Sequence, residues 1–152
     1  MLNDLNKHKL LEIFTTLAQI PSPSLSEDKV IKWVEDFCKK NNIPYELDNY
    51  ENVIIKLEAK NPEKQPILLS AHMDVVGDYS PILLKTEGDF IKTDGTRTLG
   101  ADDKAGMACA LMLASELAQV DTEHGGLEIV FTRDEEHGMT GIKHVDFKNL
   151  QS

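Results

Sequence analysis

Segments in which apolar residues repeat with helical spacing alternate along this chain with short apolar runs typical of β-strands. The helical pattern covers residues 10–17 and 30–38 and is strongest in Asp103–Val120. The strand-like segments are Tyr45–Leu47, Val53–Leu57, Ile67–Ala71, a hairpin over Ile82–Thr93 and Leu127–Thr132. This alternation predicts an α/β fold with a mixed, mostly parallel sheet flanked by helices.

The size and charge of the chain exclude several functions. Its 152 residues suit one domain, and 41% of them are hydrophobic, enough to build a core. The net charge of −10 opposes binding to nucleic acid, which needs clustered Lys and Arg. No apolar run is long enough to span a membrane, and Met1–Lys9 lacks the apolar region of a signal peptide. We therefore expect a cytoplasmic protein without nucleic-acid or membrane partners.

Residues with metal-binding chemistry stand directly after the apolar runs, where open α/β sheets form their sites. His72-Met73-Asp74 follows the run Ile67–Ala71. Because side chains alternate along an extended strand, His72 and Asp74 would point to the same side. There the imidazole can bind zinc and the carboxylate can hold its other ring nitrogen. For this pair alone, a packed histidine beside an aspartate that begins a turn is the alternative.

A second group, Gly100–Gly106, opens the long helix and contains Asp102 and Asp103. Helix capping and the helix dipole explain one acid at such a position. They explain less well the flanking glycines, which let the backbone approach another group closely. A carboxylate here could instead bridge two metal ions, which lie ~3.5–4 Å apart in two-metal hydrolases.

A third group, Glu135-Glu136, follows the run Leu127–Thr132. Two adjacent acids most often form a solvated turn. After a strand end, however, neighbouring side chains diverge, so one carboxylate can bind metal while the other acts as a general base on water. One histidine and several carboxylates form a mixed nitrogen and oxygen ligand set, which suits zinc and also manganese or cobalt.

Three motifs together resemble a known family. They are Ser70-Ala71-His72-Met73-Asp74-Val75-Val76, Leu99-Gly100-Ala101-Asp102-Asp103-Lys104-Ala105-Gly106 and Thr132-Arg133-Asp134-Glu135-Glu136-His137-Gly138. In this order they resemble the N-terminal motifs of the di-zinc family that includes peptidase T, carboxypeptidase G and aminoacylase, and the second motif is most similar to the peptidase T branch. The resemblance implies a zinc-exopeptidase-like fold and a zinc-dependent peptidase of the aminopeptidase or tripeptidase type, acting on short peptides.

The resemblance also implies a role for each matching residue. His72 would bind the first metal ion, and Asp74 would support His72. Asp102 would bridge both ions and Glu136 would bind the second, while Glu135 would be the general base. The cofactors would be two divalent ions, with zinc expected before manganese or cobalt. No residue can be matched to substrate binding.

Two further pairs are predicted to act only locally. Ser24 and Glu27 have the spacing of a capping box before the second helix. Asp103 and Lys104 are expected to cap the long helix and to form local hydrogen bonds. Neither pair is assigned any chemistry.

Family members have two further metal ligands, an aspartate and a late histidine, and an inserted lid domain that usually forms the dimer. Nothing in residues 1–152 can be matched to these parts. We therefore expect an incomplete catalytic domain, its N-terminal part, that is inactive alone because each metal ion keeps only two protein ligands. The parent would be a homodimer, and unpaired strand edges would make this chain self-associate.

Two alternative functions stay open at this point. A di-metal amidase or deacetylase of N-acyl amino acids would use the same group of residues. A non-catalytic α/β fragment would bind no metal tightly.

Overall fold

Four strands form the main sheet of the computed structural model, which describes residues 4–152. In the order β1-β2-β6-β3, they are β1 (Tyr45–Leu47), β2 (Val53–Leu57), β6 (Leu127–Thr132) and β3 (Ile67–His72). β3 and β6 run parallel, whereas the β1–β2 and β2–β6 pairs are antiparallel. The predicted α/β fold with a mixed sheet is confirmed, but the sheet is not mostly parallel.

The connections between strands explain this correction. The chain passes from β3 through helix α3 (Ala101–Gln119) before it enters β6, and such a crossover returns the chain in the same direction. Residues 48–52 join β1 to β2 by a short turn, which makes antiparallel neighbours. The apolar runs indicate that the strands are buried, but they do not show the direction of pairing.

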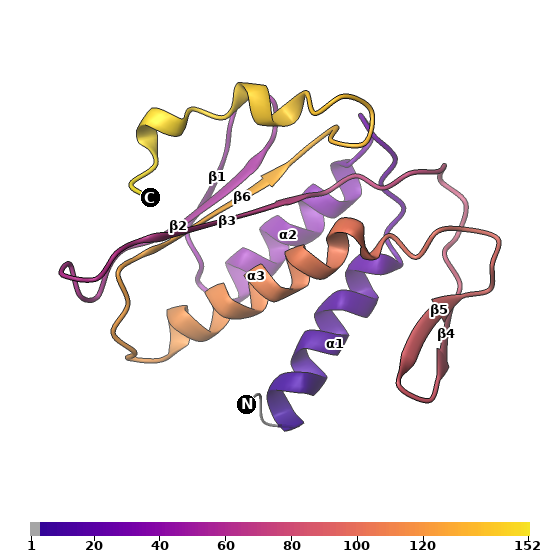
Figure 1. The fold of residues 1–152 in the computed structure, drawn as a ribbon, viewed down its shortest axis with the longest axis horizontal. Coiled ribbons are helices and arrows are strands. Elements are labelled where there is room, and N and C mark those ends of the chain that lie inside the picture. The colour runs from indigo at the N-terminus through magenta and orange to yellow at the C-terminus, as the bar shows by residue number, and fades with distance from the viewer. Residues whose placement is uncertain (1–3) are drawn as a thin grey trace.

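Three helices cover one face of the sheet. They are α1 (Asp4–Ala18), α2 (Asp28–Lys40) and α3, and Figure 1 shows the yellow C-terminal segment on the other side of the sheet. The core joins Leu17, Val34 and Leu111 of these helices to sheet residues such as Ile55 and Phe131. No helix in the described part of the chain is long and apolar enough to cross a membrane.

Both faces of β6 are covered, because all six of its residues are buried. The C-terminal segment contains the 3₁₀ turns Gly141–His144 and Phe147–Asn149. The Glu128 carboxylate on β6 accepts hydrogen bonds from the amides of Gln151 and Ser152. This double coverage explains why apolar residues fill most of β6, in which Glu128 is the buried exception that binds the C-terminal amides.

The predicted hairpin is confirmed and lies apart from the main sheet. It consists of β4 (Leu84–Glu87) and β5 (Phe90–Thr93), which pair antiparallel. Figure 1 places it beside α1, at the end of the chain segment that leaves β3. The hairpin therefore lies within the connection from β3 to α3 and forms a separate two-stranded sheet.

The expected self-association stays a prediction, and β3 gives it a location. Among the described residues, no strand pairs with β3 on the side opposite β6, and Ile67 on β3 is 56% exposed. An unpaired edge with an exposed apolar side chain readily pairs with another chain. We expect the mass from light scattering to rise with concentration. Ile67→Lys should keep the protein monomeric, whereas Val120→Lys, at an exposed apolar position off the sheet, should not. A monomer at all concentrations would contradict this expectation.

Candidate metal centre

His72 is the last residue of β3, so the strand delivers its imidazole to the carboxyl end of the sheet. Ring nitrogen Nδ1 lies 2.9 Å from the backbone oxygen of Asp74 and 3.4 Å from Oδ1 of the same residue. The other nitrogen, Nε2, lies 3.1 Å from Asp102 Oδ1 and 3.8 Å from Glu135 Oε2. Asp74 thus holds one side of the ring, and the other side faces two carboxylates, an arrangement typical of metal-binding histidines.

Asp74 is fully buried and holds more than the histidine. Its Oδ1 accepts a hydrogen bond from the Glu135 amide at 2.9 Å. Its Oδ2 accepts one from the Glu136 amide at 3.0 Å and another from the Ser24 hydroxyl at 2.6 Å. Burial alone would raise the pKa of Asp74, but the hydrogen bonds from His72, Ser24 and the two amides outweigh it and hold that pKa well below its ordinary value. One carboxylate therefore orients the histidine and both glutamates.

The start of α3 places Asp102 beside His72. Gly100 has a left-handed φ of 66°, and a Cβ there would lie 2.8 Å from Val75 Cγ1, so a larger residue would clash. Asp102 and Asp103 both have non-helical backbone angles, and regular helix begins after Asp103. The Asp102 side chain is 90% exposed, with Oδ1 directed at the imidazole. The turn at Gly100, which packs tightly against Val75, thus directs the Asp102 carboxylate toward His72 and leaves it open to solvent.

Asp103, the next residue, caps the helix. Asp103 Oδ1 accepts a hydrogen bond from the Gly106 amide at 3.0 Å, which caps the helix as predicted. A Cβ on Gly106 would lie 2.3 Å from that same oxygen. The second glycine of the motif therefore makes room for the cap, and Asp102 stays available for another partner.

The loop after β6 brings Glu135 and Glu136 to the same place. His72, Glu135 and Glu136 each offer one ligand atom, and these atoms all lie within 4.8 Å of one another. Burial, together with the carboxylates of Glu135, Asp102 and Asp74, raises the pKa of Glu136, although His72 acts in the opposite direction. The structure thus brings the four residues predicted to bind metal or act as base together, and their individual roles stay predictions.

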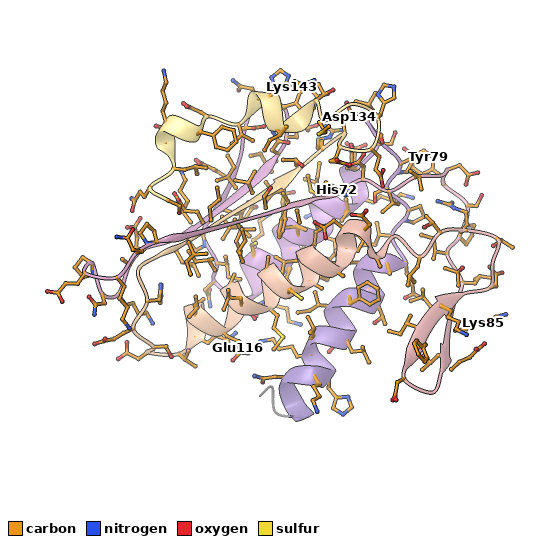
Figure 2. The ribbon with its side chains drawn as sticks, in the orientation of Figure 1. His72, Tyr79, Lys85, Glu116, Asp134 and Lys143 are labelled. Atoms are coloured by element: carbon orange, nitrogen blue, oxygen red, sulfur yellow. The ribbon has the colours of Figure 1, made fainter. Side chains whose placement is uncertain are left out.

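These residues gather at one end of the sheet. Figure 2 shows His72 and Asp134, the neighbour of Glu135, toward this end, whereas Glu116 lies at the far end of α3. Four carboxylates, from Asp74, Asp102, Glu135 and Glu136, lie around one imidazole. Such an excess of negative charge fits a bound cation, which would neutralise it.

Ser24 and Glu27 do not form the predicted capping box. Glu27 occupies the N-cap position of α2, but its side chain makes no capping hydrogen bond. Ser24 donates to Asp74, and the fully buried Glu27 carboxylate accepts hydrogen bonds from Asp134 and Arg133. Both side chains thus bind partners far along the chain, and spacing alone gave no sign of those partners.

Lys104 is also not the local hydrogen-bonding residue that was predicted. Its side chain is 1% exposed, and Nζ has no hydrogen-bond partner among the residues that the structure describes. Burial lowers the pKa of Lys104 to about 7, although the carboxylates of Asp74 and Glu27 act in the opposite direction. This buried amine is therefore close enough to Asp74 and Glu27 for their carboxylates to favour its charged form.

An α/β sheet with a histidine and acids gathered at its strand ends can hold a metal ion, and comparison with known families relates the chain to peptidases. The chain belongs to peptidase family M28, whose model matches residues 52–149, a range that contains every residue predicted for the site. It is 34% identical over 152 residues to the cytosol non-specific dipeptidase of Escherichia coli, covering 92% of this chain and 30% of that protein. It is 37% identical over 111 residues to peptidase T of Citrobacter koseri, covering 73% and 24%.

Solved structures show the same likeness. The aminopeptidase PepT of Bacillus cereus superposes with a TM-score of 0.88 at 27% identity, covering 96% of this chain and 41% of that chain. The aminoacylhistidine dipeptidase of Vibrio alginolyticus superposes with a TM-score of 0.80 at 30% identity, covering 95% and 31%. The predicted resemblance to peptidase T is therefore confirmed. The chain spans between 24% and 41% of the length of these four proteins.

In the metal-free protein, we expect His72 to titrate with a pKa of about 9. Burial alone would lower this pKa, but the hydrogen bonds to Asp74 and Asp102 outweigh burial. Because the folded-state pKa exceeds the ordinary value of 6.5, the resulting stabilisation is fully present below about pH 6.5 and is lost as pH rises through about 9. NMR titration with a chelator present would measure the pKa. Asp74→Asn should lower it and Asp121→Asn should not, whereas a wild-type value near 6.5 would contradict the prediction.

Proposed function

We propose that this protein contributes to metal-dependent hydrolysis of peptide bonds in short peptides. One observation carries the proposal: Asp74 binds His72 and the amides of Glu135 and Glu136, so that the imidazole and both glutamates face one point. Membership of a peptidase family supports the reaction class. Because the chain spans less than half the length of its relatives, the activity of the whole protein, its substrates and its partners are all part of the proposal.

His72, Asp102 and Glu136 would hold two divalent ions, with Asp102 shared between them. Imidazole nitrogen and carboxylate oxygen suit zinc, and they also suit manganese and cobalt. The surplus of carboxylates around His72 and the fixation of its Nδ1 by Asp74 both fit a cation at Nε2. Bound ions supply Lewis-acid chemistry, which makes a water molecule more acidic and a peptide carbonyl more electrophilic.

Glu135 would act as the general base. Its side chain is 38% exposed, so that water and substrate can reach its carboxylate. The carboxylate would take a proton from the attacking water and pass it to the leaving amine. The hydrogen bond from its amide to Asp74 holds the backbone of this residue, which keeps the base close to the metal ligands.

The proposed substrate is a short peptide with a free amino end. This choice follows the relatives, which are named as dipeptidases, tripeptidases and aminopeptidases. The same groups could cleave the amide bond of an N-acyl amino acid, which is the alternative substrate class. A cytoplasmic location is proposed from the name of the Escherichia coli relative, and a homodimer of the whole protein stays a prediction.

The experiment that tests the metal site is elemental analysis of the purified protein after dialysis against zinc-free buffer. We expect retained zinc, and calorimetric titration of the metal-free protein should show saturable binding. His72→Ala should weaken that binding by more than about tenfold, because it removes the nitrogen ligand. His8→Ala, at an exposed histidine of α1, should leave binding unchanged. A protein that binds no zinc in either measurement would be a non-catalytic α/β fragment.

Peptide hydrolysis should be absent when the 152-residue protein is assayed with tripeptides and added zinc. Among the described residues, each ion would have two protein ligands, and one of these, Asp102, is shared. A catalytic zinc ion normally has three. Parallel assays with N-acetyl amino acids would test the alternative substrate class. Turnover that Glu135→Ala abolishes would contradict the expected inactivity and would identify the substrate class directly.

A further inference from the structure

Two buried carboxylates hold four consecutive residues of the loop after β6. Glu27 accepts hydrogen bonds from Arg133 Nε at 2.8 Å and from the Asp134 amide at 2.9 Å. Asp74 accepts hydrogen bonds from the next two amides, those of Glu135 and Glu136, at 2.9 and 3.0 Å. The loop that carries both glutamates is therefore anchored at its start by Glu27 and at its end by Asp74.

We propose that Glu27 is a positioning residue of the metal centre, which fixes the start of this loop so that Glu135 and Glu136 face His72. Glu27 lies outside the three motifs and touches none of the candidate metal ligands. Its effect on metal affinity rests on the proposed function. Its effect on the loop backbone does not, because the hydrogen bonds involved join protein groups only.

Glu27 is well suited to act as a fixed support. Its side chain is fully buried, and the same Oε1 that binds the Asp134 amide accepts a hydrogen bond from the Leu25 amide at 3.0 Å. It stands at the N-cap position of α2, and this helix packs into the core through Val30 and Val34. The carboxylate is therefore held by a rigid element on one side and binds the loop on the other.

Asp134 has an unfavourable backbone conformation that Glu27 helps to hold. Its φ is 55°, in the left-handed region that residues with a side chain seldom adopt. This turn directs the following amides at Asp74. A hydrogen bond from its own amide to Glu27 holds the residue in that conformation. Without Glu27, the Asp134 amide would be buried without a partner, and the turn would lose the contact that favours it.

Two basic side chains lie near the two acids. Arg133 contacts Glu27 through Nε, and its side chain is 12% exposed. The buried amine of Lys104 is attracted to both Glu27 and Asp74. Glu51 also contacts Arg133, but it is 55% exposed, and no hydrogen bond joins it to an amide of residues 134–136. Glu51 therefore supplies a matched control, since it shares the arginine with Glu27 but does not hold the loop.

The first measurement is residue-specific amide hydrogen exchange of the metal-free protein. In Glu27→Ala, we expect protection of the Glu135 and Glu136 amides to fall about tenfold or more, although these amides bind Asp74 and not Glu27. Amides in the middle of α3 and β6 should keep their protection. Glu51→Ala should leave the whole loop unchanged. Unchanged protection at Glu135 and Glu136 in a folded Glu27→Ala protein would overturn the proposal.

The second measurement is zinc affinity by calorimetry. Glu27→Ala should weaken zinc binding by about 10–100-fold, the range found for groups that orient metal ligands, whereas Glu51→Ala should change it less than about twofold. Glu27→Gln can keep the Asp134 contact through its amide oxygen and should recover part of both losses. If circular dichroism shows that Glu27→Ala does not fold, Glu27→Gln decides: a partial loss confined to the loop supports the proposal, and no loss overturns it.

The two measurements separate this proposal from the proposed function. If the wild-type protein binds no zinc, the metal-site proposal fails, and the exchange experiment alone decides whether Glu27 positions the loop. If Glu27→Ala weakens zinc binding but leaves the exchange of the loop amides unchanged, the positioning role is overturned and the metal site stands.

Discussion

The buried carboxylate of Asp74 is the group on which the rest of the candidate site depends. It contacts His72 at the end of β3, both glutamate amides of the loop after β6 and the Ser24 hydroxyl before α2. Each donor would cost about 1–3 kcal/mol if left buried without a partner, so these segments have little freedom to move apart. A single side chain thus connects three parts of the fold that are distant in sequence.

The fold class could be predicted because buried strands and helix faces require apolar residues at regular positions in the sequence. The segment Leu127–Thr132 is mostly apolar because the helices cover one face of β6 and the C-terminal segment covers the other. Strand direction leaves no such pattern, since Val53–Leu57 has the same composition whether it pairs parallel or antiparallel with β6. The sequence therefore predicts this strand at its observed bounds but not the direction in which it pairs.

The convergence of His72, Asp102, Glu135 and Glu136 could be foreseen for a geometric reason. Each stands at the end of a strand, shortly after one or at the start of the crossover helix, and these ends meet at one edge of the sheet. Ser24, Glu27 and Lys104 could not be assigned in this way. Their roles come from partners on other elements, and the spacing of Ser24 and Glu27 also matched a common local motif. Buried polar side chains are thus the part of this site that only the three-dimensional structure reveals.

The pairing of β3 with β6 has a consequence for the variability of the chain. His72 and Thr132 are register partners on adjacent parallel strands, so the histidine and the glutamate loop leave the sheet at the same level. Their separation is set by the spacing between neighbouring strands and not by the length of chain between them. The β4–β5 hairpin and its connecting segments can therefore lengthen, shorten or change sequence while the relative placement of these two ends is kept. Related chains can therefore differ in this segment, and so in what they bind there, while they keep the same arrangement of the histidine and the two glutamates.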